Sequence, residues 1–301
     1  MIGIIPKAGR LALRLAFVAA GLAFVVRAVL QGIDDGSFGD LNVGWLAATV
    51  LCAAAGMTVV AARWSVAASL VGGDLPVAKA IPLYFQGEIG KYIPGSVWAV
   101  LGRSELARRA GLSRSAAYAS VMGSLAALYL GAALTAALLL PVAAGARGTT
   151  AVVGVLAFLV VGIGGLHPAV VRRVVGLGER LTRKTFDVAI PSWRDAIGVV
   201  VGYIPAWILI GAAHASAAVA LGSSVSYPQV LFATAVSWSV GFLAIPAPGG
   251  IGVRESVFVL VSGLPGSKAA AAALLARVVF IAVDGLGALI GALWMTRRSD
   301  D

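Results

Sequence analysis

The sequence predicts an all-α, polytopic integral membrane protein, and three observations support this. Hydrophobic residues make up 60% of the 301 residues and charged residues only 12%, about half the share typical of soluble domains. Several segments are apolar and long enough to cross a hydrocarbon core about 30 Å thick as helices. Two further stretches combine charged residues with helix-breaking Pro and Gly. We therefore expect one domain over residues 1–301, with about six full transmembrane helices and two re-entrant helical hairpins.

The chain opens with an apolar span and an acidic loop. Lys7, Arg10 and Arg14 precede the span, and no small-residue cleavage site follows it, so we expect a retained helix and not a signal peptide. The loop Gln31–Asn42 carries three Asp and no Lys or Arg, which predicts that it lies outside. The six predicted full spans are Leu11–Leu30, Val43–Ala62, Ala116–Leu140, Thr150–Leu166, Ala196–Leu221 and Ala269–Trp294.

The first predicted hairpin covers residues about 77–109 and contains Gln86–Arg103, which reads QGEIGKYIPGSVWAVLGR. We expect one helix to about Tyr92, a turn at Pro94 and Gly95, and a second helix from Ser96. Non-helical backbone at membrane depth is tolerated only where protein or a water-filled cavity surrounds it. Basic residues follow the hairpin, so it is predicted to enter and leave from the inside.

The second predicted hairpin covers residues about 230–262. The apolar helix Val230–Ile245 is stopped by a break that includes Pro248, Gly249 and Gly250, and the short helix Ile251–Ser262 follows. With both termini inside, this hairpin enters from the outside. Two broken hairpins from opposite faces are typical of inverted-repeat transporters, although the repeat is only weakly marked in the sequence.

The basic residues indicate how the chain is oriented. The net charge is +10, and the most basic connection, residues about 169–195, reads as a cytoplasmic amphipathic segment. It either touches anionic headgroups or only sets the topology. The basic residues lie beside apolar spans and are not interleaved with aromatics on a polar face, so we expect no nucleic acid partner. The predicted location is the inner or plasma membrane, with both termini cytoplasmic.

Ionisable residues inside a membrane cost several kcal/mol each unless they are paired or hydrated, so they indicate a functional site. Glu88 and Lys91 lie three residues apart on one predicted helix face, and Arg277 and Asp284 lie seven apart on another. Such residues pair in the empty state, and an anionic headgroup can displace a carboxylate. In the alternative interpretation the pairs only hold the bundle together. The residues of this kind are Glu88, Lys91, Arg254, Glu255, Arg277 and Asp284.

The two Pro-Gly breaks predict a second source of positive potential. Ser96 is placed to cap the helix that runs to Arg103, and Gly249 and Gly250 leave backbone amides exposed before Arg254. Helix N-termini bind anions, phosphate in particular.

Other patterns are less specific. Tyr203, Trp207 and His214 share one helix face, which indicates a core or lipid-facing stripe or, alternatively, polar tips that line a cavity. Cys52 is the only cysteine, and two histidines are too few for a metal site. The GEIGK and GGIGVRE segments lack the spacing of phosphate-binding loops and dinucleotide motifs. We therefore expect no metal and no nucleotide cofactor.

The segments GEIGKYIPGSVWAVLGR and IPAPGGIGVRE, in an all-helical membrane chain, resemble the lysylphosphatidylglycerol synthase transmembrane-region family, the flippase-like half of the multiple peptide resistance factor. Members are implicated in moving lipids with polar, often phosphate-bearing headgroups between leaflets. No soluble aminoacyl-transferase domain follows Trp294, so we expect no lipid synthesis and no enzyme activity. The residues carried over by the resemblance are Glu88, Lys91, Pro94, Gly95, Trp98, Arg103, Pro248, Gly249, Gly250, Gly252, Arg254 and Glu255.

These observations together predict a lipid flippase for an anionic or zwitterionic membrane lipid. Lys91 and Arg254, with Arg103 or Arg277, are expected to hold a phosphate near the midplane, while the Glu side chains are counter-ions or bind a cationic headgroup. One alternative is a transporter of polyprenyl phosphate or of a polyprenyl-linked sugar. The other is a non-transporting membrane partner of a cell-envelope enzyme.

Overall fold

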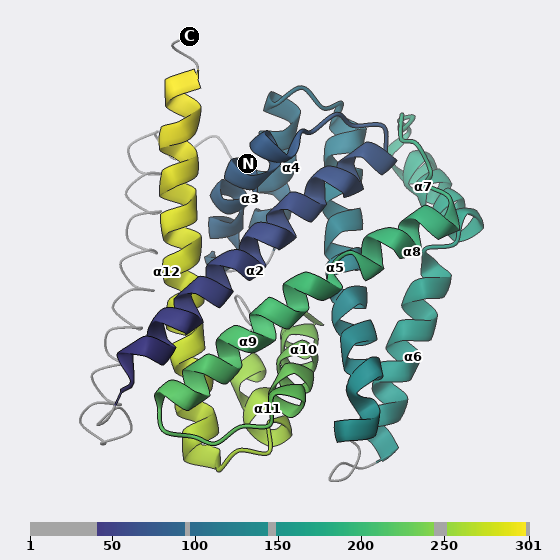
Figure 1. Cartoon of the computed structure of the whole chain (residues 1–301). Coiled ribbons are helices and arrows are strands. Elements are labelled where there is room, and N and C mark those ends of the chain that lie inside the picture. The colour runs from purple at the N-terminus through teal and green to yellow at the C-terminus, as the bar shows by residue number, and fades with distance from the viewer. Residues whose placement is uncertain (1–40, 94–96, 144–148, 244–251, 299–301) are drawn as a thin grey trace.

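The computed structural model of the chain describes residues 41–93, 97–143, 149–243 and 252–298, and every regular element in these ranges is helical (Figure 1). The predicted first span and nearly all of the acidic loop after it lie outside the described residues. The helices are α2 (Val43–Leu70), α3 (Val77–Glu88), the 3₁₀ helix η1 (Ile89–Tyr92), α4 (Trp98–Arg109), α5 (Arg114–Ala143), α6 (Thr149–Gly165), α7 (Pro168–Thr182), α8 (Trp193–Val201), α9 (Ile204–Ala220), α10 (Tyr227–Leu243), α11 (Val253–Val261) and α12 (Gly266–Arg298).

Four segments of the described chain are long and apolar enough to cross a membrane, with mean hydropathies of 1.9 to 2.1. A fifth candidate combines α6 with α7, which are bent by 72° relative to each other. The prediction of a multi-pass, all-helical membrane protein is confirmed, and the count of six spans with two re-entrant hairpins stays a prediction. The four segments are Val43–Leu70, Arg114–Pro141, Trp193–Ala220 and Gly266–Met295.

The predicted span Ala196–Leu221 is divided into α8 and α9. The break falls at Gly202 and Tyr203, and Pro205 lies in the first turn of α9. Proline has no backbone N–H and its ring crowds the preceding turn, so the helix restarts here and does not continue. Tyr203 lies at this interruption, and its hydroxyl is hydrogen-bonded to the hydroxyl of Ser124 on α5 at 2.8 Å.

The described helices form two sets with the same order: a long membrane segment, a short turn, a hairpin of two helices and a second long helix. The first set is α2 to α5, and the second is α8 to α12. The two turns have the same hydrogen bond, from Gly73 N to Ala68 O at 2.9 Å and from Ser223 N to Ala218 O at 3.0 Å. Gly72 and Gly222 have φ of +82° and +68°, the left-handed conformation that ends helices and suits glycine.

The two sets run in opposite directions. Asn42 N, at the start of α2, donates to Ala220 O at the end of α9, and Ala189 N, before α8, donates to Val71 O after α2. The long segments α2 and α8–α9 therefore lie antiparallel across the middle of the molecule (Figure 1). Figure 1 also shows α3 and α4 at one end of the molecule and α10 and α11 at the opposite end.

Close packing between α2 and α9 forms the centre of the core. A Cβ on Gly56 would lie 3.1 Å from Ile210, so the absence of a side chain lets the helices approach closely. Buried interhelical hydrogen bonds connect α5 to both helices: Trp64 Nε1 donates to Ser120 at 3.1 Å, and Trp207 Nε1 donates to the Leu128 carbonyl at 2.8 Å. Of the predicted stripe, Tyr203 and Trp207 are therefore core residues.

The helical part of the basic connection is α7. Its apolar side chains are largely exposed, with Val174, Leu177 and Leu181 lying on one side of the helix. Basic side chains, including Arg172 and Arg180, occupy the rest of its surface. A helix of this kind that turns away from the axis of the preceding span is typical of the membrane interface.

The packing of α12 against α3 gives a test of the fold. A Cβ on Gly291 would lie 2.9 Å from the Pro82 carbonyl oxygen and 3.0 Å from its Cα, and backbone cannot move aside as a flexible side chain does. We expect Gly291→Ala to lower the free energy of unfolding by about 1–3 kcal/mol, the usual cost of overpacking.

The control is Gly285→Ala on the same helix, where no atom would lie within 4 Å of the new Cβ. It should leave the melting temperature in detergent unchanged or raise it, because alanine favours helix over glycine by about 1 kcal/mol. Equal melting temperatures for the two variants would contradict the close contact of α3 with α12.

Candidate binding cavity

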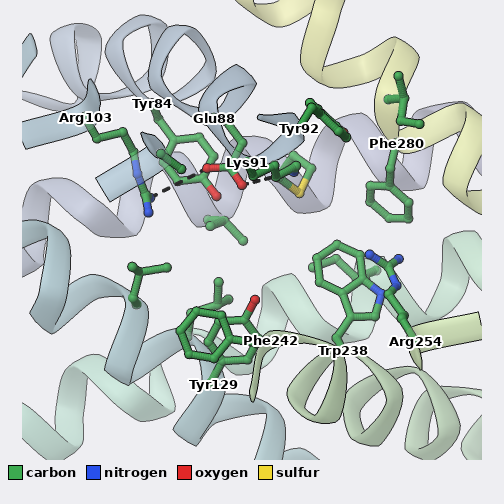
Figure 2. A pocket seen from close by; sticks show the side chains of 18 of the residues that line it. Tyr84, Glu88, Lys91, Tyr92, Arg103, Tyr129, Trp238, Phe242, Arg254 and Phe280 are labelled. Carbon is green, nitrogen blue, oxygen red and sulfur yellow. Dashed lines mark hydrogen bonds and ion pairs between the residues drawn. The ribbon is translucent and has the colours of Figure 1, made fainter. Parts of the chain in front are cut away.

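A cavity of about 140 Å³ lies between the two hairpins, with space for on the order of ten water molecules (Figure 2). Its wall combines apolar and aromatic side chains with charged side chains from both hairpins and from α12. A cavity that is mostly apolar with a few convergent polar groups is typical of a ligand site. The charged residues that line it are Glu88, Lys91, Arg103, Arg254 and Arg277.

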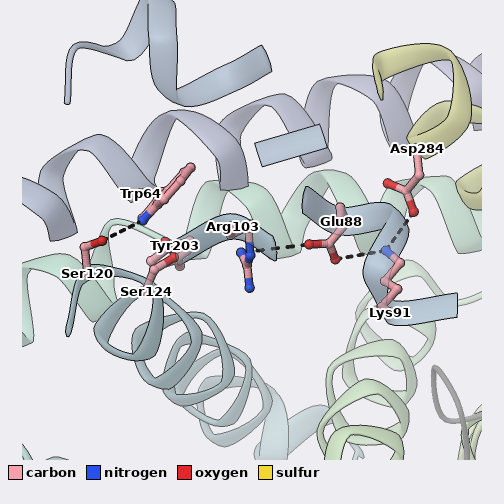
Figure 3. Close-up of polar contacts among 8 residues, drawn as sticks. All are labelled: Trp64, Glu88, Lys91, Arg103, Ser120, Ser124, Tyr203 and Asp284. Carbon is pink, nitrogen blue, oxygen red and sulfur yellow. Dashed lines mark hydrogen bonds and ion pairs between the residues drawn. The ribbon is translucent and has the colours of Figure 1, made fainter. Parts of the chain in front are cut away.

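Ion pairs form a continuous chain along the side of the cavity that belongs to the first hairpin (Figure 3). Lys91 Nζ lies 3.0 Å from Glu88 Oε1 and 2.7 Å from Asp284 Oδ2 on α12. Arg103 Nη1 lies 3.8 Å from the other Glu88 oxygen, Oε2. The Tyr92 hydroxyl donates to Asp284 Oδ2 at 2.6 Å. One ammonium group therefore lies between two carboxylates.

The local backbone explains this arrangement. The chain changes from α to 3₁₀ helix after Glu88, and in a 3₁₀ helix residues three apart are eclipsed, which aligns Lys91 with Glu88. Gly87 and Gly90 let α4 approach: a Cβ on Gly90 would lie 2.7 Å from Ala99 N, and one on Gly87 would lie 3.0 Å from Arg103 Cα. The close contact holds the Arg103 guanidinium 4.9 Å from the centre of the Tyr84 ring.

The second hairpin presents Arg254 in a different setting. Its guanidinium carbon lies 3.5 Å from the centre of the Trp238 ring, a cation–π contact, and 5.8 Å from that of Phe280. Arg254 Nη2 lies 3.4 Å from His214 Nε2. The Ile210 carbonyl can only accept, so His214 Nδ1, 2.9 Å away, carries the proton and Nε2 is left as the acceptor for Arg254. These three close contacts of the guanidinium, with Trp238, Phe280 and His214, are all neutral.

Glu255 connects α11 to α12 beside the cavity. One carboxylate oxygen pairs with Arg277, and the other accepts a hydrogen bond from Gly252 N at 2.7 Å. The second bond satisfies an amide at the start of α11, where helix N–H groups have no helical partner. Arg277 is thus neutralised, although it also lines the cavity.

The charges around the cavity are unbalanced within the described residues. Lys91, Arg103 and Arg277 each have a carboxylate partner, whereas Arg254 has none. Two buried donors, Arg103 Nε and Trp238 Nε1, also have no hydrogen-bond partner in this part of the chain. A partly buried cation without a carboxylate partner and unpaired donors around one cavity are chemically suited to bind an anion.

The structure brings together most of the predicted site residues that it describes. Glu88, Lys91, Arg103, Arg254 and Arg277 line the cavity, and Glu255 and Asp284 pair with lining residues. The half-exposed Trp98 lies at the start of α4 and is not among the lining residues. The predicted residues that lie outside the described chain are Pro94, Gly95, Ser96, Pro248, Gly249 and Gly250.

Two aspects of the site differ from the sequence expectation. Arg277 and Asp284 face different partners, Glu255 and Lys91, so the ion pairs connect α12 to the hairpins and do not form along one helix. The sequence also did not predict the aromatic wall of the cavity. His214, which does not line the cavity but contacts Arg254, was marked through its alignment with Tyr203 and Trp207. Neutral aromatics are common in membrane helices, so nothing in the sequence separated the lining ones from the others. They are Tyr84, Tyr92, Tyr129, Trp238, Phe242 and Phe280.

The chain matches a known protein family over most of its length. The family model described as "Lysylphosphatidylglycerol synthase TM region" matches residues 11–287 of the 301 residues. No curated protein matches the chain.

The shared ammonium group gives a test of the site. Lys91→Met leaves Asp284 buried without a cation, and breaking such a pair costs about 3–5 kcal/mol, so we expect a lower melting temperature in detergent. Adding Asp284→Asn removes the unpaired charge and should restore part of the loss.

The control is Arg108→Met, because Arg108 pairs with Glu105 on the exposed end of α4, where ion pairs contribute little. If the double variant melts no higher than Lys91→Met alone, Lys91 and Asp284 are not energetically coupled.

Proposed function

Because this chain belongs to the lysylphosphatidylglycerol synthase transmembrane-region family, we propose that it is a flippase that moves a phosphate-bearing lipid between the two membrane leaflets. The observation that carries this proposal is Arg254, a partly buried residue whose guanidinium lines a cavity between two hairpins and has no carboxylate partner among the described residues.

The setting of Arg254 favours a phosphate. Trp238 covers one face of the guanidinium, which leaves its N–H edge for hydrogen bonds. A planar guanidinium donates two parallel hydrogen bonds to a phosphate, and such charge-assisted bonds are stronger than neutral ones. The unpaired Trp238 Nε1 supplies a further donor to the same cavity. Lys91 and Arg103 are additional cations that a phosphate reaches by displacing Glu88.

The architecture favours transport between leaflets. The two matched sets of helices run in opposite directions, and the hairpins lie at opposite ends of the molecule with the cavity between them (Figures 1 and 2). Inverted repeats with a midplane site at broken helices open alternately to the two sides. We therefore propose six full spans and two re-entrant hairpins, with transport that is downhill or coupled to an ion gradient.

Lipid transfer in proteoliposomes tests the role of Arg254. We expect Arg254→Gln to slow transfer of fluorescent phosphatidylglycerol by about 10- to 100-fold, because a hydrogen bond to a charged group contributes about 1.5–3 kcal/mol. Arg254→Lys keeps the charge without the planar fork and should fall between that variant and the wild type. Arg108→Gln, on the exposed end of α4, is the matched control and should transfer lipid at the wild-type rate.

An unchanged rate in Arg254→Gln would contradict the proposed site. Competition by polyprenyl phosphate against phosphatidylglycerol would identify a carrier-lipid transporter instead. If the purified wild type transfers neither lipid but forms a stable complex with a cell-envelope enzyme, the protein is a non-transporting partner.

A further inference from the structure

We propose that Asp284 is a proton-binding site, and that an anion entering the cavity at Lys91 is bound together with one proton, which makes the proton a co-substrate. This inference rests on the proposed function, because it requires an anion in the cavity. It identifies the proton as the ion whose movement is coupled to lipid transport.

Asp284 is fully buried and depends on two donors. Lys91 Nζ and the Tyr92 hydroxyl both approach its Oδ2, at 2.7 and 2.6 Å. Its second oxygen, Oδ1, is buried and has no hydrogen-bond partner in the described chain. The carboxylate therefore has one cation, and its other oxygen is free to carry a proton.

The position of the cavity determines which ion pairs an entering anion disrupts. Lys91 lines the cavity, and Asp284 lies behind it. An anion in the cavity attracts the Lys91 ammonium group away from both carboxylates. Glu88 still has Arg103, whose Nη1 lies 3.8 Å from its Oε2. Asp284 then keeps, of its partners in the described part of the chain, only the neutral Tyr92 hydroxyl.

A buried carboxylate that loses its cation binds a proton, because the neutral acid is far less costly to bury than the charge. The O–H bond forms at Asp284 with a proton from the aqueous side to which the cavity is open. The proton leaves when the anion leaves and Lys91 returns. No other co-reactant is required.

Among the described residues, no cation other than Lys91 forms an ion pair with Asp284. Two of the elements packed against α12 carry titratable side chains near Asp284: Tyr84 and Glu88 on α3, and Lys91 and Tyr92 on η1. Arg277, on α12 itself, is paired with Glu255. The other titratable side chains on these elements are the exposed Lys79 on α3, Cys52 and Arg63 on α2, His214 on α9, and Arg254 and Glu255 on α11.

Proton coupling also affects the cost of crossing the membrane. One negative charge and one proton together leave the total charge of the site unchanged. Moving a net charge across a membrane potential costs about 2.3 kcal/mol per 100 mV, and this cost is avoided when the charge does not change. A proton gradient then supplies the driving force.

Calorimetry on the detergent-solubilised full chain tests this inference, with short-chain phosphatidylglycerol as the probe. A phosphodiester keeps its single charge between about pH 6 and pH 8, so any pH dependence comes from the protein. Titrations in buffers of different ionisation enthalpy should show uptake of up to one proton per anion bound. The affinity should fall by up to about tenfold per pH unit as the pH rises.

Asp284→Asn should bind the probe without proton uptake and without pH dependence. The matched control is Glu105→Gln: hydrogen bonds from Arg108 and Arg109 lower the pKa of the exposed Glu105 carboxyl to about 2, so it does not titrate in this range. This variant should take up the proton as the wild type does.

The outcomes are distinguishable. Binding by the wild type without proton uptake overturns this inference and leaves the proposed function intact. Absence of binding at every pH contradicts the proposed function as well. Proton uptake that persists in Asp284→Asn places the proton on another group and overturns the assignment. If that variant does not fold, the proton stoichiometry of the wild type still decides whether binding and protonation are coupled.

Discussion

The Lys91 ammonium group lies between a carboxylate of its own hairpin and a carboxylate of α12. At the membrane depth that we propose for this hairpin, no bulk water solvates these charges, so each is stabilised by an opposite charge elsewhere in the protein. This requirement places η1 against α12 and keeps Glu88 directed toward Arg103 on α4. The first hairpin forms one wall of the cavity. Its position depends on the Lys91 ammonium group, which Glu88 and Asp284 share.

Each hairpin places an arginine beside the cavity, but only one of the two arginines has a carboxylate partner among the described residues. Arg103 lies over Tyr84 and Arg254 over Trp238, so each guanidinium on the second helix of a hairpin stacks on an aromatic ring of the first. Arg103 has Glu88 as a counter-ion, whereas Arg254 faces His214. In a molecule built from two similar halves, this difference makes the two ends of the cavity unequal, so the anion that we propose would have a preferred end.

The sequence was sufficient to predict the fold class because hydrophobic length and helix-breaking residues act locally. Pro and Gly mark the ends of helices within a few residues of where the structure has them, as at Gly72 and Pro76 between α2 and α3. The set of buried charges was predictable for the same reason: each is unusual in its own segment. The break between α8 and α9 was also signalled, by Gly202 and Pro205, but was hidden by the strong apolar character of the segment.

The partners of those charges could not be predicted, because pairing depends on how helices rotate against each other. Spacing along α12 placed Arg277 and Asp284 on one face, yet packing directs them to different hairpins. The glycines that permit this packing, such as Gly87 and Gly90, are significant only because α4 lies against them. In a chain with 38 glycines, no sequence feature indicates which ones have a backbone as a neighbour.

The least predictable feature of the site is also the one most closely linked to its chemistry. A carboxylate at position 214 would neutralise Arg254 and leave no attraction for an incoming anion. Histidine, with its Nδ1 proton held by the Ile210 carbonyl, orients the guanidinium through Nε2 without adding negative charge. Trp238 and Phe280 also contact the guanidinium without adding negative charge. Neutral partners therefore fix the position of Arg254 without pairing its charge, and the anion-binding site that we propose requires both.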